Sequence, residues 1–210
     1  MNTKYIIFSD FDGTISKEDT LDKIITDLYS FEKYKQLETL LLDNKLSYKD
    51  YLYNTFNNID YNIQNLSTNI IDEHFIDFYN WISTFNIPFY IISSGFKYII
   101  SSLLPYINKT QIFANDVMII NDRWYVKMYD EKNNLPLNKV FVINALHYDG
   151  YKTIYIGDGL SDFSVIDHVD IIFCKNGSLF HSKCIEQNIV HHVYYSFQDV
   201  LRECKLLLKL

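Results

Sequence analysis

Short runs of consecutive apolar residues recur along the chain, and most of them end at small or acidic residues. The runs are residues 5–8, 88–92, 153–156 and 171–173. Continuous apolar runs rich in Ile, Tyr and Phe are typical of strands that are covered on both faces, as in a parallel sheet. Helical patterns lie between the runs, so the sequence predicts a doubly wound α/β fold with a parallel sheet at its core.

The stretch from residue 16 to residue 85 lacks such runs and shows helical spacing instead. Its first set of apolar residues three or four positions apart is Leu21, Ile24, Ile25 and Leu28. This spacing predicts a small all-helical cap over residues 16–85, inserted into a core domain made of residues 1–15 and 86–210.

Three further patterns complete the predicted core. Residues 117–128 alternate around Asn121 and Asp122, which predicts a hairpin. Helical spacing over residues 138–147 places Lys139 at the start of a helix, and residues 196–210 predict a closing amphipathic helix.

The composition describes a folded chain and excludes some partners. Of 210 residues, 48% are hydrophobic and 21% charged, which is globular rather than disordered. The net charge of −7, with only two arginines, argues against a nucleic-acid groove. No apolar stretch approaches the roughly 20 residues of a membrane helix, and no signal peptide is recognised. The three cysteines fall in no CxxC pair, so we expect reduced thiols and a cytoplasmic location.

The strongest chemical signal directly follows the first predicted strand, where Asp10 and Asp12 precede Gly13 and Thr14. Ligands of open parallel sheets bind beyond the carboxyl ends of the strands, where these carboxylates would lie. Two carboxylates this close normally need a cation or a shared proton. The alternative is an ordinary turn, because Asp and Gly are common turn residues.

A second acidic motif follows the strand predicted at residues 153–156. Asp158 lies between Gly157 and Gly159, and Asp162 comes one helical turn later. Carboxylate oxygens around a small cavity suit Mg²⁺. Four of the six glycines fall in the motifs that follow strands, and the four are Gly13, Gly95, Gly157 and Gly159. In so glycine-poor a chain, this placement indicates backbone conformations or close approaches that other residues cannot make.

A third motif, Ser93, Ser94 and Gly95, lies between a predicted strand and a helix that begins near Phe96. A hydroxyl and several backbone N–H groups at a helix N-terminus can bind phosphate. An ordinary helix cap is the alternative. Lys139 taken alone would be a solvated lysine, as most lysines are.

Taken in order, these motifs resemble the four motifs of the haloacid dehalogenase superfamily of phosphohydrolases. The resemblance implies a Rossmann-like core with the helical insert as a cap, and Mg²⁺ as cofactor. By position, Asp10 resembles the nucleophile and Asp12 the general acid and base. The implied phosphate-binding groups are Ser93, Ser94, Gly95 and Lys139. The implied metal ligands are Asp10, the backbone carbonyl of Asp12, and Asp158, with Asp162 and Gly159 in support.

Two branches of that superfamily suggest different substrates. Phosphoserine phosphatases bind the substrate amine with an acidic residue after the first motif, here Asp19 or Glu18, and its carboxylate with a cap arginine. Residues 16–85 contain no arginine. A closer resemblance is to the methionine-salvage phosphatases that act on 2-hydroxy-3-keto-5-methylthiopentenyl-1-phosphate, carried by residues 10–19, 45–56, 87–96 and 186–200. We therefore expect a phosphatase for a small phosphorylated metabolite, as a monomer or homodimer. An inactive module that binds a phosphorylated ligand is the alternative of another class.

Overall fold

The computed structural model describes residues 4–29, 31–43, 45–146 and 149–209. Within them a seven-stranded sheet has the order β4-β3-β2-β1-β5-β6-β7. The strands are β1 (Lys4–Ser9), β2 (Phe89–Phe96), β3 (Ile112–Ile120), β4 (Arg123–Lys127), β5 (Tyr151–Gly157), β6 (Ile171–Lys175) and β7 (His192–Tyr194). All neighbours pair in parallel except β3 and β4, which form the predicted hairpin. The predicted α/β fold is therefore confirmed.

Helices connect these strands and cover the sheet. The α-helices are α1 (Thr20–Leu28), α2 (Phe31–Leu42), α3 (Tyr48–Phe56), α4 (Phe75–Thr84), α5 (Lys97–Leu103), α6 (Lys139–Ala145), α7 (Leu179–Glu186) and α8 (Phe197–Leu208). Short 3₁₀ helices are η1 (Ile63–Asn65), η2 (Thr68–Ile70), η3 (Lys109–Gln111) and η4 (Leu160–His168). The helices predicted after Asn138 and Ser196 are α6 and α8. Their predicted last residues, His147 and Leu210, lie outside the described residues.

The two faces of β1 pack against different sets of helices, because successive strand side chains point to opposite faces. Ile7 lies in a buried cluster with residues of α4, α5 and α8, among them Phe75, Ile99 and Phe197. Ile6 and Phe8 lie in a second buried cluster with residues of α6, η4 and α7, among them Val142, Val165 and Phe180. Both faces of the strand are buried, which explains why its sequence is a continuous apolar run.

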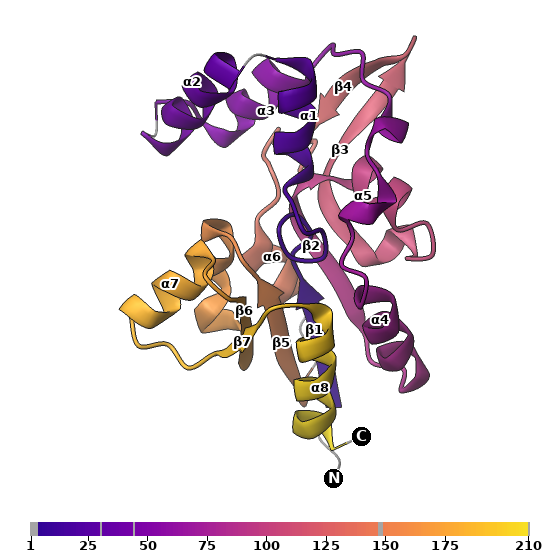
Figure 1. Ribbon diagram of the computed structural model, residues 1–210, viewed down its shortest axis with the longest axis vertical. Helices are drawn as coiled ribbons and strands as arrows, with labels where there is room; N and C mark the ends of the chain where they lie inside the picture. The colour runs from indigo at the N-terminus through magenta and orange to yellow at the C-terminus, as the bar shows by residue number, and fades with distance from the viewer. Residues whose placement is uncertain (1–3, 30, 44, 147–148, 210) are drawn as a thin grey trace.

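Helices α1–α3 lie beyond one end of the sheet, beside the β3–β4 hairpin (Figure 1). Phe56 of α3 meets Phe96 edge to face, and the indole N–H of Trp124 on β4 donates to the carbonyl of Tyr61. Helix α4 instead packs on the sheet, where Phe75 contacts Phe89 and Phe197. The division into a core domain and a cap over residues 16–85 stays a prediction, and α4 packs differently from α1–α3.

Two strands were not predicted in full from the sequence. β3 begins at Ile112, before the predicted hairpin, and β7 is only three residues long. His192 lies in β7 and stacks on Phe173 of β6, with ring centroids 4.9 Å apart. The three cysteines are free and buried. Among the described residues, no helix combines the length and apolar character that crossing a membrane requires.

Candidate active site

Asp10 and Asp12 follow β1 directly and face different partners. Asp10 is 6% exposed, and its backbone N–H donates to the carbonyl of Ile156 on β5 at 2.9 Å. Asp12 Oδ1 accepts from the backbone N–H of Thr20 at 2.9 Å and from its hydroxyl at 2.5 Å. Asp12 Oδ2 accepts from the Ser93 hydroxyl at 3.4 Å. Asp12 is therefore held by the first turn of α1 and by the third motif.

Asp10 belongs to a second group of charges, which Lys139 joins. One carboxylate oxygen each from Asp10, Asp158 and Asp162 lies within 4.8 Å of the others. Lys139 Nζ lies 3.1 Å from Asp10 Oδ1 and 2.5 Å from Asp162 Oδ1. Burial raises the pKa of Asp10 well above its usual range, and the Lys139 ammonium opposes that rise. The structure thus gathers three motifs that are far apart in the sequence at one edge of the sheet.

Asp162 is buried, and both of its oxygens are occupied by donors. Its Oδ1 accepts from Lys139 and from the Tyr155 phenol, each at 2.5 Å. Its Oδ2 accepts from the backbone N–H groups of Asp158 and Gly159, each at 2.8 Å. Four donors thus occupy the two oxygens of Asp162, which orients the groups around it.

The donor set suits a hard divalent cation. Asp10 and Asp158 offer carboxylate oxygens, the ligand type that Mg²⁺ prefers. Burial raises the pKa of Asp158 to about 6, and the negative charge of Asp162 raises it as well. Carboxylates that burial and mutual repulsion push toward the protonated form are stabilised as anions by a bound cation. The Asp12 side chain lies outside this group and faces Thr20 and Ser93.

The third motif, residues 93–95, was predicted between a strand and a helix but lies within β2, as a bulged segment that we call the turn. Its groups face Asp12. Ser93 is fully buried, and its hydroxyl accepts from the backbone N–H of Gly95 at 2.9 Å. A Cβ at position 95 would lie 2.6 Å from Asp12 Oδ2, closer than real Cβ contacts come. Glycine at position 95 is therefore required for the turn to approach the carboxylate.

The side chain of Tyr48, at the start of α3, also reaches this turn. Its phenol donates to the Ser94 carbonyl at 2.9 Å. Burial raises the pKa of the phenol well above its usual range, and Tyr51 and Asp19 raise it further, so the group stays a donor. Asp19 itself caps α1 by accepting from the backbone N–H groups of Leu21 and Asp22. Asp19 and Glu18 are both exposed, and their predicted role in specificity stays a prediction.

Other residues of this region were not predicted from the sequence. They are Thr14, Thr20, Tyr48, Asn115, Tyr155 and Lys175. Lys175 Nζ donates to the Gly13 carbonyl at 2.7 Å, and the Thr14 hydroxyl donates to Asp158 Oδ1 at 2.7 Å. Thr14 closes the motif that follows β1, and Lys175 is the last residue of β6, positions that could have drawn attention to them. Asn115 lies inside β3 and carries no such signal.

Gly13 → Ala tests the close packing of the first motif on Asp158. Gly13 has a φ of +75°, and a Cβ there would lie 2.3 Å from Asp158 Oδ2. We expect a loss of about 1–2 kcal/mol in unfolding free energy from the left-handed backbone alone, plus displacement of Asp158. Gly177→Ala is the matched control, since its φ is +72° and nothing lies within 4 Å of its Cβ. Denaturant unfolding should show a similar loss of unfolding free energy from the backbone in both variants. Mg²⁺ titration should show weaker binding in Gly13→Ala alone.

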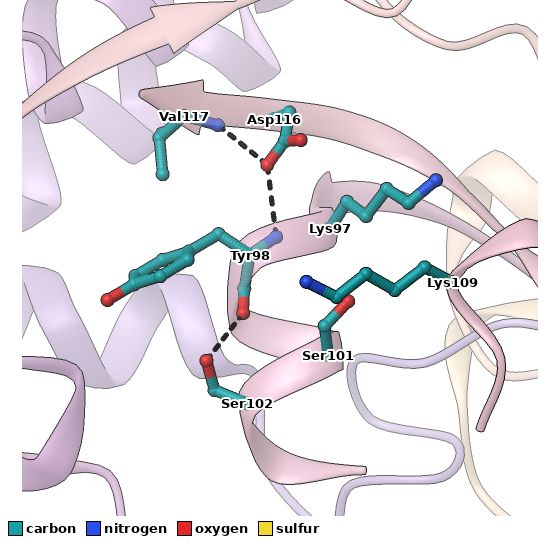
Figure 2. Close-up of a pocket in the computed structure, with 7 residues that line it drawn as sticks. All are labelled: Lys97, Tyr98, Ser101, Ser102, Lys109, Asp116 and Val117. Atoms are coloured by element: carbon teal, nitrogen blue, oxygen red, sulfur yellow. Dashed lines mark hydrogen bonds between the residues drawn. The ribbon is translucent and has the colours of Figure 1, made fainter. Parts of the chain in front are cut away.

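A separate hollow of about 230 Å³ lies between α5 and β3 (Figure 2). Lys97, Ser101 and Lys109 are among its lining residues. The carboxylate in its wall, Asp116, accepts from the backbone N–H groups of Tyr98 at 3.1 Å and Val117 at 2.9 Å. This carboxylate is committed to backbone donors, so the hollow does not match the chemistry of the acidic cluster.

Comparisons with known proteins find relatives that match most of the chain. The sequence profile described as haloacid dehalogenase-like hydrolase matches residues 7–167. The polyol phosphate phosphatase PYP1 of Saccharomyces cerevisiae is 31% identical over 229 aligned positions, which cover 98% of this chain and 94% of that protein. A 2-hydroxy-3-keto-5-methylthiopentenyl-1-phosphate phosphatase of Bacillus cereus is 28% identical, with 97% of each chain covered. A phosphoserine phosphohydrolase-like protein of Francisella tularensis has a similar fold, with a TM-score of 0.72, 20% identity, and 93% and 97% of the two chains covered.

Proposed function

The chain belongs to the haloacid dehalogenase-like hydrolase family and is a phosphatase, and from this premise we propose that it hydrolyses phosphomonoesters of small metabolites through an aspartyl-phosphate on Asp10. The ion pair of Asp10 with Lys139 carries the proposal. A carboxylate attacks a phosphate dianion only where nearby cations offset their repulsion. Lys139 supplies one such charge beside the attacking oxygen.

In the first step an oxygen of Asp10 forms a bond to phosphorus, and the bond from phosphorus to the substrate oxygen breaks. Asp12 gives its proton to the departing alkoxide, which leaves as an alcohol. Burial raises the pKa of Asp12, while the hydrogen bonds from Thr20 lower it. These opposing effects support a carboxyl group that can both give and take a proton.

In the second step water attacks the phosphorus of the aspartyl-phosphate, and Asp12 takes the proton of that water. The bond between Asp10 and phosphorus breaks, which releases inorganic phosphate and restores both carboxyl groups. Ser93, the backbone of Ser94 and Gly95, and Lys139 would hold the phosphoryl oxygens in both steps.

Asp10 and Asp158 would hold Mg²⁺, with the Asp12 carbonyl completing the proposed set. Bound there, the ion would offset the negative charge that gathers at the phosphate and the carboxylates. We expect a chelator to lower phosphate release by at least about 10²-fold and added Mg²⁺ to restore it. Activity that is equal with chelator and with Mg²⁺ would contradict the metal role.

The substrate proposed is a phosphate ester of an uncharged, oxygenated carbon chain. The two relatives matched by sequence are named for such compounds, a polyol phosphate and a hydroxy-keto phosphate with a thioether. Residues 16–85 hold no arginine to clamp the carboxylate of an amino acid in a bidentate way. Tyr48, which reaches the Ser94 carbonyl from α3, presents a neutral phenol at the site.

A substrate panel tests this proposal. It contains the methylthiopentenyl phosphate, glycerol 1-phosphate as a polyol phosphate, phosphoserine and an aryl phosphate, each assayed with Mg²⁺ for phosphate release. We expect kcat/KM for one of the first two to exceed that for phosphoserine by at least about tenfold, the discrimination that unmatched buried charges produce. Preference for phosphoserine would overturn the substrate class. Binding without any phosphate release would favour the inactive binding module instead.

A further inference from the structure

The turn at Ser93, Ser94 and Gly95 interrupts the pairing of β2 with β3. Ile92 pairs with Phe113, and the next pair is Phe96 with Asn115. β2 therefore advances by four residues (96 − 92) where β3 advances by two (115 − 113), so the intervening residues leave the ladder as a bulge. Backbone groups in a buried bulge lose their ladder partners and need others.

The side chain of Asn115 is such a partner. It is fully buried, and its Nδ2 donates to the Ser94 carbonyl at 2.7 Å. Its Oδ1 accepts from the backbone N–H groups of Tyr129 at 3.2 Å and Leu137 at 3.1 Å. Leu137 stands two residues before Lys139. One buried amide thus joins the phosphate-binding turn to the segment that leads into the lysine.

The next residue of β3, Asp116, holds the residues that follow the turn, at the start of α5. Its Oδ1 accepts from the backbone N–H of Tyr98 at the start of α5 (Figure 2). Consecutive side chains of one strand point to opposite faces, so Asn115 and Asp116 lie on opposite faces of β3. Residues 94–98 are therefore fixed at both ends by neighbouring residues of β3.

We propose that Asn115 is a positioning residue that fixes the phosphate-binding turn relative to Lys139. The proposal rests on the proposed roles of Ser93 and Lys139 in phosphate binding. Because a peptide group is planar, holding the Ser94 carbonyl also sets the direction of the Gly95 N–H, which donates to the Ser93 hydroxyl. The Oδ1 of the same amide holds Leu137, two residues before Lys139. One side chain therefore sets the distance between the turn and Lys139.

Asn115→Asp tests this role because it keeps an acceptor for Tyr129 and Leu137 and removes the amide donor. A protonated carboxyl group at position 115 could still donate a hydrogen bond to the Ser94 carbonyl. Asn115→Leu is therefore tested as well, because its side chain can neither donate nor accept. We expect either variant to bind inorganic phosphate about tenfold more weakly, the effect of one buried hydrogen bond. KM should rise by a similar factor while Mg²⁺ affinity stays within about twofold, because the carboxylates are not touched.

Gln111→Glu is the matched control, since it makes the same amide-to-acid change at the last residue of η3, directly before β3. Gln111 Nε2 donates to the carbonyl of Phe89 at 3.0 Å, at the other end of β2 from the turn. We expect this variant to bind phosphate as the native protein does. Calorimetric titration with inorganic phosphate and thermal unfolding of each variant give the comparison.

Ser93→Ala combined with Asn115→Asp separates a positioning role from a general loss of stability. If Asn115 acts through the turn, the two substitutions remove part of the same interaction. The fold-loss of phosphate affinity in the double variant is then smaller than the product of the fold-losses in the two single variants. Folded Asn115 variants with native phosphate affinity would overturn the proposal, as would fully multiplicative losses. Failure of both Asn115 variants to fold while Gln111→Glu folds would assign Asn115 a purely structural role and also overturn it. If the native protein binds phosphate and hydrolyses no ester, the proposed function fails while the binding data still decide the role of Asn115.

Discussion

Replacing Asp10 by Asn is expected to lower phosphate release by at least about 10³-fold, because the amide cannot form the aspartyl-phosphate. The native protein and Asp10→Asn would be compared with Mg²⁺ and the best ester of the panel. Trapping of a phosphorylated protein by rapid acid quench should succeed with the native protein and fail with the variant. Turnover within tenfold of native would reject Asp10 as nucleophile.

This loss of activity should come without a loss of stability. Burial disfavours the Asp10 carboxylate, as do the charges of Asp162 and Asp158, and Lys139 only opposes them. An uncharged Asn is therefore expected to unfold at the same temperature as native or higher in metal-free buffer. Asp122→Asn is the control, an exposed residue of the hairpin turn with a φ of +61°, which Asn tolerates well. It should match native protein in both activity and unfolding.

Replacing Lys139 by Met is expected to remove activity and also to destabilise the metal-free protein by about 3–5 kcal/mol. The side chain has similar length but no charge, so Asp10 and Asp162 lose the cation that contacts both of them. The side chains of Asp10 and Asp162, taken without their backbone atoms, are 8% and 0% exposed. Little room is left for water to replace the ammonium. Denaturant unfolding, with and without Mg²⁺, measures the loss, and added Mg²⁺ should reduce it.

A second substitution shows whether uncompensated charge causes that instability. Asp10→Asn in the Lys139→Met background removes one of the two carboxylates and should recover part of the lost unfolding free energy, with no recovery of activity. Lys132→Met serves as the control for a lysine-to-methionine change at an exposed position. Equal stability of Lys139→Met and Lys132→Met would show that the buried ion pairs contribute nothing to the fold.

The parts of the site that could be predicted are those that follow strands. Asp10, Ser93 and Asp158 each come within two residues of the end of an apolar run, and parallel strands bring their carboxyl ends to one edge of a sheet. Lys139 opens a helix, and its partners Asp10 and Asp162 show why that position is buried. The confirmed fold class depends on the same local signal, an apolar run too short and too rich in Ile, Tyr and Phe to be a helix.

The parts that could not be predicted depend on contacts between distant segments. β7 and the first half of β3 were not predicted, because polar residues interrupt their apolar pattern, Asn115 and Asp116 in β3 and His192 in β7. Tyr48 meets Ser94 across 46 residues, and Asn115 meets Leu137 across 22, pairings that no local spacing encodes.

The sequence by itself determined the α/β class, the order of the motifs and the acidic chemistry, because these depend on residue type and on spacing within single elements. Only the tertiary structure decided how the charges are shared. It gave four donors to Asp162, brought carboxylate oxygens of Asp10 and Asp158 close to it, and turned Asp12 toward Thr20 and Ser93. Such a division is set by which donors lie within about 3 Å of each oxygen, and that distance is fixed only when the strands and helices pack together.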